Sequence, residues 1–405
     1  MTSVQPSQQT SSSPRDDTAP TPSDSSIGRL VGVDLARALA VFGMYAVHVG
    51  PPLSATHGVG GWIRYLVDGR SSILFATLAG FSLVLIAGRR PKTGRAGRQA
   101  KARIAIRALI LIALGTLMTV FYGDVVILAC YGCYFLLALP LARLRAETLA
   151  IIAAALALST PQLAYLLRSA LTEPVRQAID AYDPLERISG VGVVDLALTG
   201  MYPTITWMSF IVAGMALARL DLASGAVQRR VAALGATLTV LGYGSSRLLG
   251  GPDALKSTAE SGPDSGAMPP VGSEAISQMP ASSLLAAGPH SNTTFDIIGS
   301  VGFAILVIVG ATAATEYLPR LRRMAGPLIA VGAMSLTAYV GHFVVMSALA
   351  LPPGKSGPPS AASWTPLLVL ILGAMVFATI WSRFFRRGPL EYLLNATTRP
   401  AKYLR

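Results

Sequence analysis

The stretch Arg29–Gly50, RLVGVDLARALAVFGMYAVHVG, decides how the rest of this 405-residue sequence is interpreted. It has the length and hydropathy of a membrane-spanning helix, yet it contains Asp34, Arg37 and His48. Ionisable side chains are costly inside a span and are therefore candidates for function. Arg37 and His48 are 11 residues apart, and at 100° per residue they lie within about 20° of each other on the helix surface. Asp34 is one turn from Arg37, so the helix presents one polar stripe to a partner helix or a cavity.

The composition indicates a membrane protein. Hydrophobic residues make up 52% of the chain and charged residues 13%, and the apolar residues fall into blocks of about 20, the length needed to cross a bilayer. We therefore predict an all-α, polytopic membrane bundle of about ten transmembrane helices. The predicted spans are 31–49, 69–88, 103–121, 124–142, 147–169, 199–218, 229–249, 295–315, 327–351 and 364–384.

The distribution of charge predicts the orientation. Segment 88–107 contains eight Lys or Arg residues and no acid, whereas loop 251–294 has one Lys and four acids. Cytoplasmic loops carry the excess of Lys and Arg, so both termini are expected on the cytoplasmic side of the cytoplasmic (inner) membrane. The net charge of +13 follows from this rule and does not indicate a nucleic-acid partner.

The predicted organisation is simple. Residues 1–28 form a disordered cytoplasmic tail, 29–395 the transmembrane domain and 396–405 a basic cytoplasmic tail. Loop 251–294 is rich in Gly, Ser, Pro and Ala and is expected to be flexible and extracytoplasmic. Cys130 and Cys133 lie within an apolar block and are interpreted as small packing residues; no metal-ligand spacing is present. A homo-oligomer is compatible with the sequence.

The four histidines are the candidates for acid–base chemistry. His57 follows the first span in an outer loop, where Asp68 would orient its ring; an ordinary polar loop residue is an equally good interpretation. For His48, a polar contact between helices is favoured over direct catalysis. His342 is interpreted as a packing residue that lines the same cavity, and His290 as a solvated bystander.

The charged groups near the membrane faces have two interpretations each. Asp34 and Arg37 form an intrahelical ion pair, or an anion site at the cytoplasmic mouth. The basic run sets topology and binds anionic lipid, or it recognises a phosphorylated donor; its candidate residues are Arg89, Arg90, Arg95 and Arg98. At the outer entry, Asp68 caps the next helix, or Arg70 and Ser71 line a polar substrate cavity.

Two regions resemble known families. The segment 33–41, VDLARALAV, followed by Gly43-Met44, His48, Asp68-Gly-Arg70-Ser71-Ser72 and Ala79-Gly80, resembles the bacterial relatives of heparan-α-glucosaminide N-acetyltransferase, within a superfamily of transmembrane acyltransferases. The C-terminal segments 335–339, SLTAY, and 387–392, RGPLEY, resemble a related family of uncharacterised bacterial membrane proteins. Where the first family commonly has Arg-Gly, this chain has Arg37-Ala38.

The resemblance implies a membrane acyltransferase. Such proteins take an acyl group from cytosolic acyl-CoA, usually acetyl-CoA, and deliver it to a hydroxyl or amine of an extracytoplasmic sugar, glycan or glycolipid. The position that matches the catalytic histidine is His57, with Asp68 in support; in the wider superfamily the nearest match is His48. The implied partners are the lipid bilayer, the acyl donor and an envelope carbohydrate or glycolipid.

Two other functions are weighed against this hypothesis. A secondary transporter, proton-coupled through Asp34 and His48 or His342, would use the same intramembrane residues, although the internal repeats common in transporters are not evident in the sequence. A non-catalytic scaffold would leave the polar stripe of the first span unexplained.

Overall fold

The computed structural model describes residues 24–89, 93–122, 126–256, 280–349 and 363–403. Within these ranges the regular elements are helices and none is a strand. A helix satisfies its backbone hydrogen bonds internally, which the hydrocarbon core of a bilayer demands. The prediction of an all-α membrane fold is thus confirmed. The first helix, α1 (Asp24–Val49), begins before the predicted boundary at Arg29, and residues 1–23 of the predicted tail lie outside the described residues.

Six helices in the described part of the chain are long and apolar enough to cross a membrane. They are α1 over Val31–Val49, α2 with α3 over Gly58–Ala87, α4 (Gly94–Tyr122), α6 (Ala146–Ala170), α12 (Thr294–Tyr317) and α16 (Thr365–Phe384). The bent pair α14–α15 would make seven. The predicted count of ten is therefore not confirmed. At 1.5 Å per residue, α5 (Ile127–Ala138) and α9 (Thr204–Arg219) are too short to cross a core of about 30 Å, and α10 (Gly225–Leu249) is not apolar enough.

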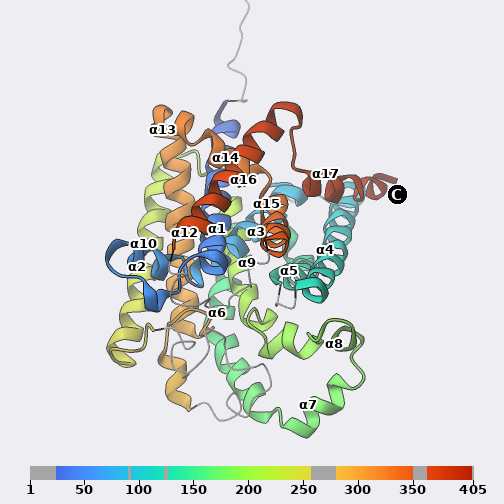
Figure 1. Cartoon of the computed structure of the whole chain (residues 1–405). Coiled ribbons are helices and arrows are strands. Elements are labelled where there is room, and N and C mark those ends of the chain that lie inside the picture. Colours follow the sequence, from blue (N-terminus) through green and yellow to red (C-terminus); the bar gives the residue numbers. More distant parts are fainter. Residues whose placement is uncertain (1–23, 90–92, 123–125, 257–279, 350–362, 404–405) are drawn as a thin grey trace, which may run out of the picture.

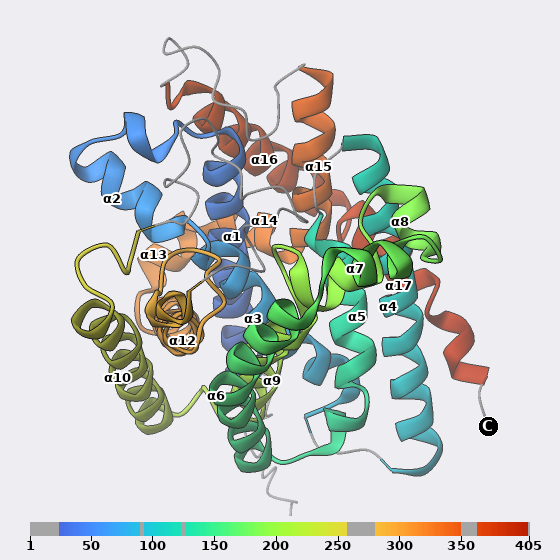
Figure 2. The same cartoon turned by 90° about the horizontal axis from the view of Figure 1, so that it is seen from below.

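The bundle has a central group of helices between two outer pairs. Seen from below, α1, α3 (Arg70–Ala87) and α9 lie between the α10–α12 pair on one side and the α4–α5 pair on the other (Figure 2). Figure 1 places the start of α1 and α13 (Pro319–Met324) at the upper end, and α7 (Glu173–Asp180) with α8 (Pro184–Ser189) at the lower end.

Close packing of α3 on α9 depends on glycine. A Cβ atom on Gly80 would lie 2.0 Å from the carbonyl oxygen of Ile211, and one on Gly214 would lie 1.9 Å from that of Thr77. Small residues let helix backbones approach where the surrounding lipid is as apolar as the helix surfaces. The two glycines therefore set the distance between α3 and α9, and with it the position of the polar residues at the start of α3.

The ninth predicted span, 327–351, is broken. α14 (Gly326–Ala333) and α15 (Ser335–Ala348) meet at Met334 with a bend of 89°. The start of α15 is capped by Glu391 of α17 (Pro389–Ala396): its Oε1 accepts from the backbone N–H groups of Leu336 and Thr337 at 2.7 and 3.1 Å, and its Oε2 accepts from the Thr337 hydroxyl at 2.5 Å. The carboxylate satisfies donors that a helix start leaves free. The cap fixes the orientation of α15, and so places His342 next to the end of α1.

Parts of the predicted tails and loop are packed. The backbone N–H of Ala287 donates to the carbonyl oxygen of Ala254 at 2.7 Å, although 251–294 was predicted to be flexible; residues 257–279 of that loop lie outside the described residues. In the predicted C-terminal tail, η7 (Arg399–Tyr403) lies on α4, where Gln99 Nε2 donates to the Lys402 carbonyl at 2.9 Å.

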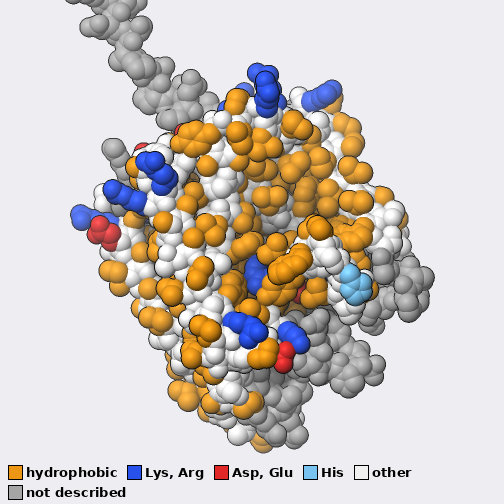
Figure 3. All heavy atoms as spheres, turned by 90° about the vertical axis from the view of Figure 1, so that its left-hand side faces the viewer, with side chains coloured by type: hydrophobic (Ala, Val, Ile, Leu, Met, Phe, Trp, Pro, Cys, Tyr) orange, Lys and Arg blue, Asp and Glu red, His pale blue; other side chains and the backbone are white. Residues whose placement is uncertain are grey.

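The surface fits a bilayer. Exposed leucine, isoleucine and valine side chains are frequent on α4, α6, α10 and α16. Figure 3 shows hydrophobic side chains over most of one face, with Lys and Arg side chains along its upper part and others near and below its middle. A surface that is largely apolar is the pattern of a helical membrane protein.

Candidate functional site

A hydrogen-bonded histidine pair joins α1 to α15. Nδ1 of His48 lies 2.8 Å from Nε2 of His342, and the two rings are stacked at a centroid distance of 5.0 Å with an interplanar angle of 11°. Nδ1 of His342 bonds to the carbonyl oxygen of Tyr339, one turn earlier in α15. The structure therefore brings together two of the three histidines that the sequence singled out.

The hydrogen-bond partners determine the tautomers of His48 and His342. A carbonyl oxygen only accepts, so the proton of His342 lies on Nδ1 and its Nε2 is the acceptor. His48 must then donate from Nδ1, and Nε2 of His48 carries a lone pair. No described residue hydrogen-bonds to that Nε2 atom, and the residue is only half-buried. The arrangement presents an oriented, unprotonated imidazole nitrogen, which is what a general base requires.

Aromatic side chains enclose the pair. Phe343 lies 5.4 Å from the His48 ring and 4.2 Å from the His342 ring, centroid to centroid. Tyr45 packs on His342 at 4.9 Å, while its hydroxyl donates to the Ala338 carbonyl at 2.7 Å. These contacts hold both imidazoles in one orientation. His342 is packed among aromatic rings, as the sequence predicted, and is in addition hydrogen-bonded to His48.

The predicted pairing of His57 with Asp68 is wrong. Residues 58–67, predicted as part of a loop, form α2 (Gly58–Val67), with His57 at its start and Asp68 at its end. Eleven residues at 1.5 Å each separate the two by about 16 Å along the helix. His57 is exposed, and Asp68 is half-buried. A catalytic role for His57 stays a prediction, but one without the support of Asp68.

His290 is the histidine beside Asp68. A Cβ atom on Gly69 would lie 3.0 Å from Pro289 and 3.4 Å from the backbone nitrogen of His290. The His290 ring packs on Tyr202 and on Trp207 at centroid distances of 5.6 and 6.3 Å, and its Nδ1 atom is buried without a hydrogen bond from a described residue. Burial lowers the pKa of His290, and the charge of Asp68 opposes that shift. The interpretation of His290 as a solvated bystander was wrong.

Arg70 is buried in the bundle and bonds through two of its nitrogen atoms. Its guanidinium lies 4.7 Å from the ring centroids of both Tyr65 and Tyr243, its Nε donates to the Tyr243 hydroxyl at 3.0 Å and its NH1 group donates to the Tyr65 carbonyl at 2.7 Å. The Tyr243 hydroxyl lies 2.8 Å from Ser300 Oγ, which donates to Asp296 Oδ1 at 2.9 Å. Because the Ser300 proton goes to Asp296, Tyr243 donates to Ser300, and a directed chain of hydrogen bonds links Arg70 to Asp296.

The Ser71 hydroxyl is also engaged within the bundle. Its hydroxyl donates to the Val67 carbonyl at 2.7 Å and packs where a Cβ on Gly43 would stand 2.0 Å away. The predicted substrate-binding roles of Arg70 and Ser71 are therefore not supported by their contacts; both residues join α3 to its neighbours.

Asp34 and Arg37 form the predicted ion pair. Arg37 NH1 lies 2.5 Å from Asp34 Oδ1, and its NH2 group donates to the Ser82 hydroxyl of α3 at 2.7 Å. Both side chains are half-buried. The alternative role in an anion site remains a prediction, since the guanidinium already has two partners.

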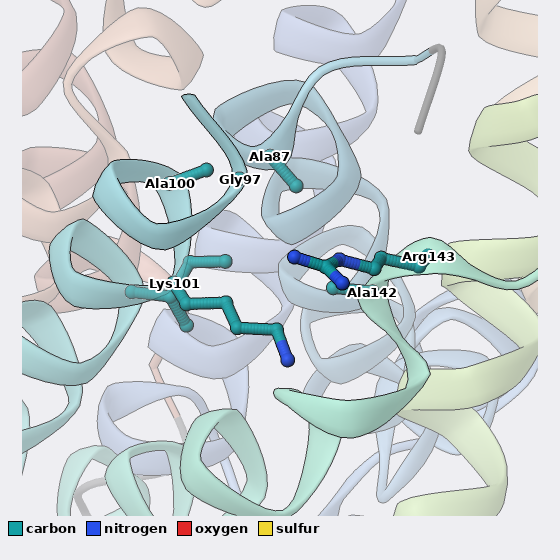
Figure 4. Close-up of a pocket in the computed structure, with 7 residues that line it drawn as sticks. Ala87, Gly97, Ala100, Lys101, Ala142 and Arg143 are labelled. Atoms are coloured by element: carbon teal, nitrogen blue, oxygen red, sulfur yellow. The ribbon is translucent and has the colours of Figure 1, made fainter. Parts of the chain in front are cut away.

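The basic run divides into tethering and exposed residues. Arg89 NH2 donates to the Leu220 carbonyl at 3.2 Å and so ties the end of α3 to that of α9. Arg95 and Arg98 are exposed on the first turns of α4, and Arg90 lies outside the described residues. Beside them is a small hollow between α3, α4 and η2 (Pro140–Arg143) (Figure 4), lined by Ala87, Gly97, Ala100, Lys101, Ile104, Ala142 and Arg143.

Two cationic side chains, Lys101 and Arg143, line this hollow, and nothing in the sequence indicated that they lie together. Figure 4 shows the side chains of Lys101 and Arg143 reaching toward the same space. Its volume of about 10 Å³ admits no more than one water molecule. The hollow itself is too small for a phosphate group; beside it, Arg95, Arg98 and Lys101 share one face of α4 at spacings of three residues.

Sequence reasoning missed Arg64 as well. It lies on the inner side of α2, close enough to His48 for its charge to act on that ring. The signal was available: Val59, Trp62, Ile63 and Leu66 follow the i, i+3, i+4, i+7 spacing of one helix face, and all four are exposed. Arg64 falls outside that face and therefore had to point inward.

These features define a polytopic helical membrane protein with a polar site between α1, α2 and α15. Residues 29–246, more than half of the chain, match the family described as heparan-alpha-glucosaminide N-acetyltransferase, catalytic, and the chain belongs to that family. Residues 274–400 match a second family, described as a protein of unknown function, DUF418. Both resemblances predicted from the sequence are confirmed. Among curated proteins, none matches the chain.

The histidine pair crosses the boundary between the two matched regions. His48 belongs to the acetyltransferase-like region, and His342 with Tyr339 belongs to the region of unknown function. Likewise, Arg70 belongs to the acetyltransferase-like region, and Asp296, at the other end of its hydrogen-bond chain, belongs to the region of unknown function. The two regions thus form one site, and membership in the family assigns the chain to the membrane acyltransferases in general terms.

Proposed function

We propose that this protein transfers an acyl group, acetyl in the first instance, from cytosolic acetyl-CoA to a hydroxyl or amine of an extracytoplasmic sugar, glycan or glycolipid, in the cytoplasmic membrane. Family membership supports the reaction class. The observation that carries the proposal is the directed chain from His48 to the Tyr339 carbonyl, which leaves Nε2 of His48 unprotonated.

The chemistry assigned to His48 is general-base catalysis. Nε2 takes the proton of the acceptor hydroxyl or amine as its oxygen or nitrogen attacks the thioester carbonyl. The imidazolium that forms keeps its Nδ1–H bond to His342, whose own orientation is held by the Tyr339 carbonyl. His342 therefore acts as a positioning residue in place of the carboxylate that often supports a catalytic histidine.

The donor is proposed to enter from the opposite end of the bundle. α3 runs antiparallel to α1, so its end lies with the start of α1, as the bond from Arg37 to Ser82 shows. Arg95, Arg98 and Lys101 lie at this end and supply cations for the CoA phosphates, which Arg binds through paired hydrogen bonds. The flexible pantetheine arm then reaches along the bundle toward His48, across part of a core of about 30 Å.

The test is acetyl transfer by the purified protein in lipid nanodiscs. Radiolabelled acetyl-CoA is supplied with glucosamine, and both label transfer and acetyl-CoA hydrolysis are followed for the wild type, His48→Ala and His57→Ala. Loss of turnover in His48→Ala with activity retained in His57→Ala supports the proposal. Loss in His57→Ala alone moves the catalytic role to His57.

A second arm separates the enzyme from the transporter. Equilibrium binding of acetyl-CoA is measured for the wild type and for the combined Arg95→Ala, Arg98→Ala and Lys101→Ala variant. Absence of both acetyl-CoA binding and turnover in well-folded wild-type protein would overturn the acyltransferase proposal. The transporter hypothesis would then be tested by measuring substrate flux in proteoliposomes.

A further inference from the structure

Arg64 is buried with unused hydrogen-bonding capacity. Only 6% of the residue is exposed. Its Nε donates to the carbonyl oxygen of Pro51 at 3.0 Å, three residues beyond His48 in the chain. Its NH1 group is buried and bonds to no described residue, and no carboxylate of the described chain forms an ion pair with it, although the charge of Asp68 acts on it.

The buried NH1 group of Arg64 can donate to a further hydrogen-bond acceptor. A buried donor without a partner destabilises the folded protein, and does so more when the group is charged. The exposed apolar face of α2, with Trp62 at 67% exposure, keeps Arg64 turned inward. The bond to Pro51 holds the guanidinium next to the segment that carries His48. The free N–H group is thus directed into the bundle near the proposed base and away from lipid.

We propose that Arg64 donates to the carbonyl oxygen of the acyl donor and stabilises the oxyanion that forms when the acceptor attacks. This inference rests on the proposed function. In this assignment α2 supplies the group that stabilises the oxyanion, and α1 supplies the general base, His48. Preorganised donors aimed at developing negative charge are often the largest single contribution to acyl transfer.

The acceptor oxygen or nitrogen forms a bond to the thioester carbon, its proton moves to Nε2 of His48, and the carbonyl π pair becomes the oxyanion bound by Arg64. When the carbonyl re-forms, the carbon–sulfur bond breaks. The CoA thiolate leaves and takes the proton from His48, which returns both residues to their starting states.

Kinetics of four variants, together with those of His48→Ala, test the assignment in full-length protein in nanodiscs, with labelled acetyl-CoA as donor and glucosamine as acceptor. Arg64→Gln removes the charge and Arg64→Lys keeps it, while Arg64→Ala leaves space for an added guanidinium compound. Arg168→Gln is the matched control, because Arg168 is a half-buried arginine of another helix whose Nε and NH2 groups both donate to the Leu198 carbonyl, at 2.8 and 2.6 Å.

The expected result is a fall in kcat of about 100-fold or more for Arg64→Gln, with the KM for acetyl-CoA nearly unchanged and acetyl-CoA binding intact. Arg64→Lys should fall less. Millimolar ethylguanidinium should restore part of the turnover of Arg64→Ala but none of that of His48→Ala. Arg168→Gln should keep its kcat.

The outcomes are distinguishable. An active wild type with unchanged kcat in Arg64→Gln, or a change in KM alone, overturns the role of Arg64 and leaves the proposed function standing. If the Arg64 variants lose thermal stability together with activity and ethylguanidinium restores nothing, Arg64 is structural. A wild type that neither binds nor turns over acetyl-CoA overturns the proposed function and this inference with it.

Discussion

His48 and His342 are 294 positions apart in the sequence, yet Nδ1 of the first lies 2.8 Å from Nε2 of the second. The bond ties the last turn of α1 to the middle of α15, and so joins the region that matches the acetyltransferase family to the region that matches the family of unknown function. A separate function for the C-terminal region is hard to reconcile with a residue that orients His48.

Loss of either histidine should lower turnover to different extents. His48→Ala removes the proposed base, and a general base contributes about 100- to 10,000-fold to rate. His342→Gln keeps a side chain at this place but no longer receives the Nδ1–H bond in the same geometry, so we expect a smaller fall in kcat. Both are measured as label transfer from acetyl-CoA. Equal activity of His48→Ala and wild type would remove His48 from the mechanism.

The cap of α15 should matter as much for activity as for stability. Glu391→Ala frees the N–H groups of Leu336 and Thr337 and the Thr337 hydroxyl, and loss of a helix cap costs about 1 kcal/mol. Because α15 carries His342, kcat should fall together with the unfolding temperature, measured in detergent. Glu147→Ala is the control: Glu147 is exposed in the first turn of α6, and its loss should change stability by less than about 0.5 kcal/mol.

The helical membrane fold could be predicted because hydropathy and charge are properties of short windows of sequence. The polar stripe of α1 was predicted as well, but not its partners: Arg37 bonds to Ser82 of α3, and His48 to His342 of α15. These pairs depend on the packing of distant helices. The break at Met334 was invisible for a related reason, since the apolar run continues through it and the cap that defines it comes from Glu391.

The failed pairing of His57 with Asp68 has a local cause. The glycines of the segment GVGGWIRYLV suggested a loop, whereas the spacing of Val59, Trp62, Ile63 and Leu66 is that of an amphipathic helix. A helix holds its two ends apart where a loop could have folded back. The same helix turns Arg64 inward, so a single misinterpreted segment accounts for both the wrong pair and the missed arginine.

Stability should decrease on acidification in part through His290. Burial lowers the pKa of His290 in the folded protein, so the unfolded chain binds the proton more readily, and the free energy of unfolding falls as the pH drops below the unfolded pKa of about 6.5. His290→Asn removes the titrating group, and Asn tolerates the left-handed backbone at this position, where φ is 59°.

The measurement is the difference in unfolding temperature between pH 7.5 and pH 5.5, in detergent, for wild type and His290→Asn. The variant should lose less on acidification than the wild type. Asp68 faces His290, and its charge opposes the lowering of the His290 pKa. The Asp68→Asn variant should therefore lose more unfolding temperature on acidification than the wild type does. An equal loss in wild type and His290→Asn would show that other groups carry the pH dependence.

The contact between α3 and α9 gives the last prediction. In Gly80→Ala the new methyl group would stand 2.0 Å from the Ile211 carbonyl oxygen, a backbone atom that cannot rotate away. The helices must separate, at a cost of about 1–3 kcal/mol for an overpacked site, and the start of α3 should shift with them. Gly373→Ala on α16 is the matched control, because its Cβ meets nothing within 4 Å; there the higher helix propensity of Ala should leave stability unchanged or slightly raised. Unfolding temperatures in detergent compare the two variants, and a Gly80→Ala protein as stable as Gly373→Ala would mean that α3 and α9 pack less closely than described.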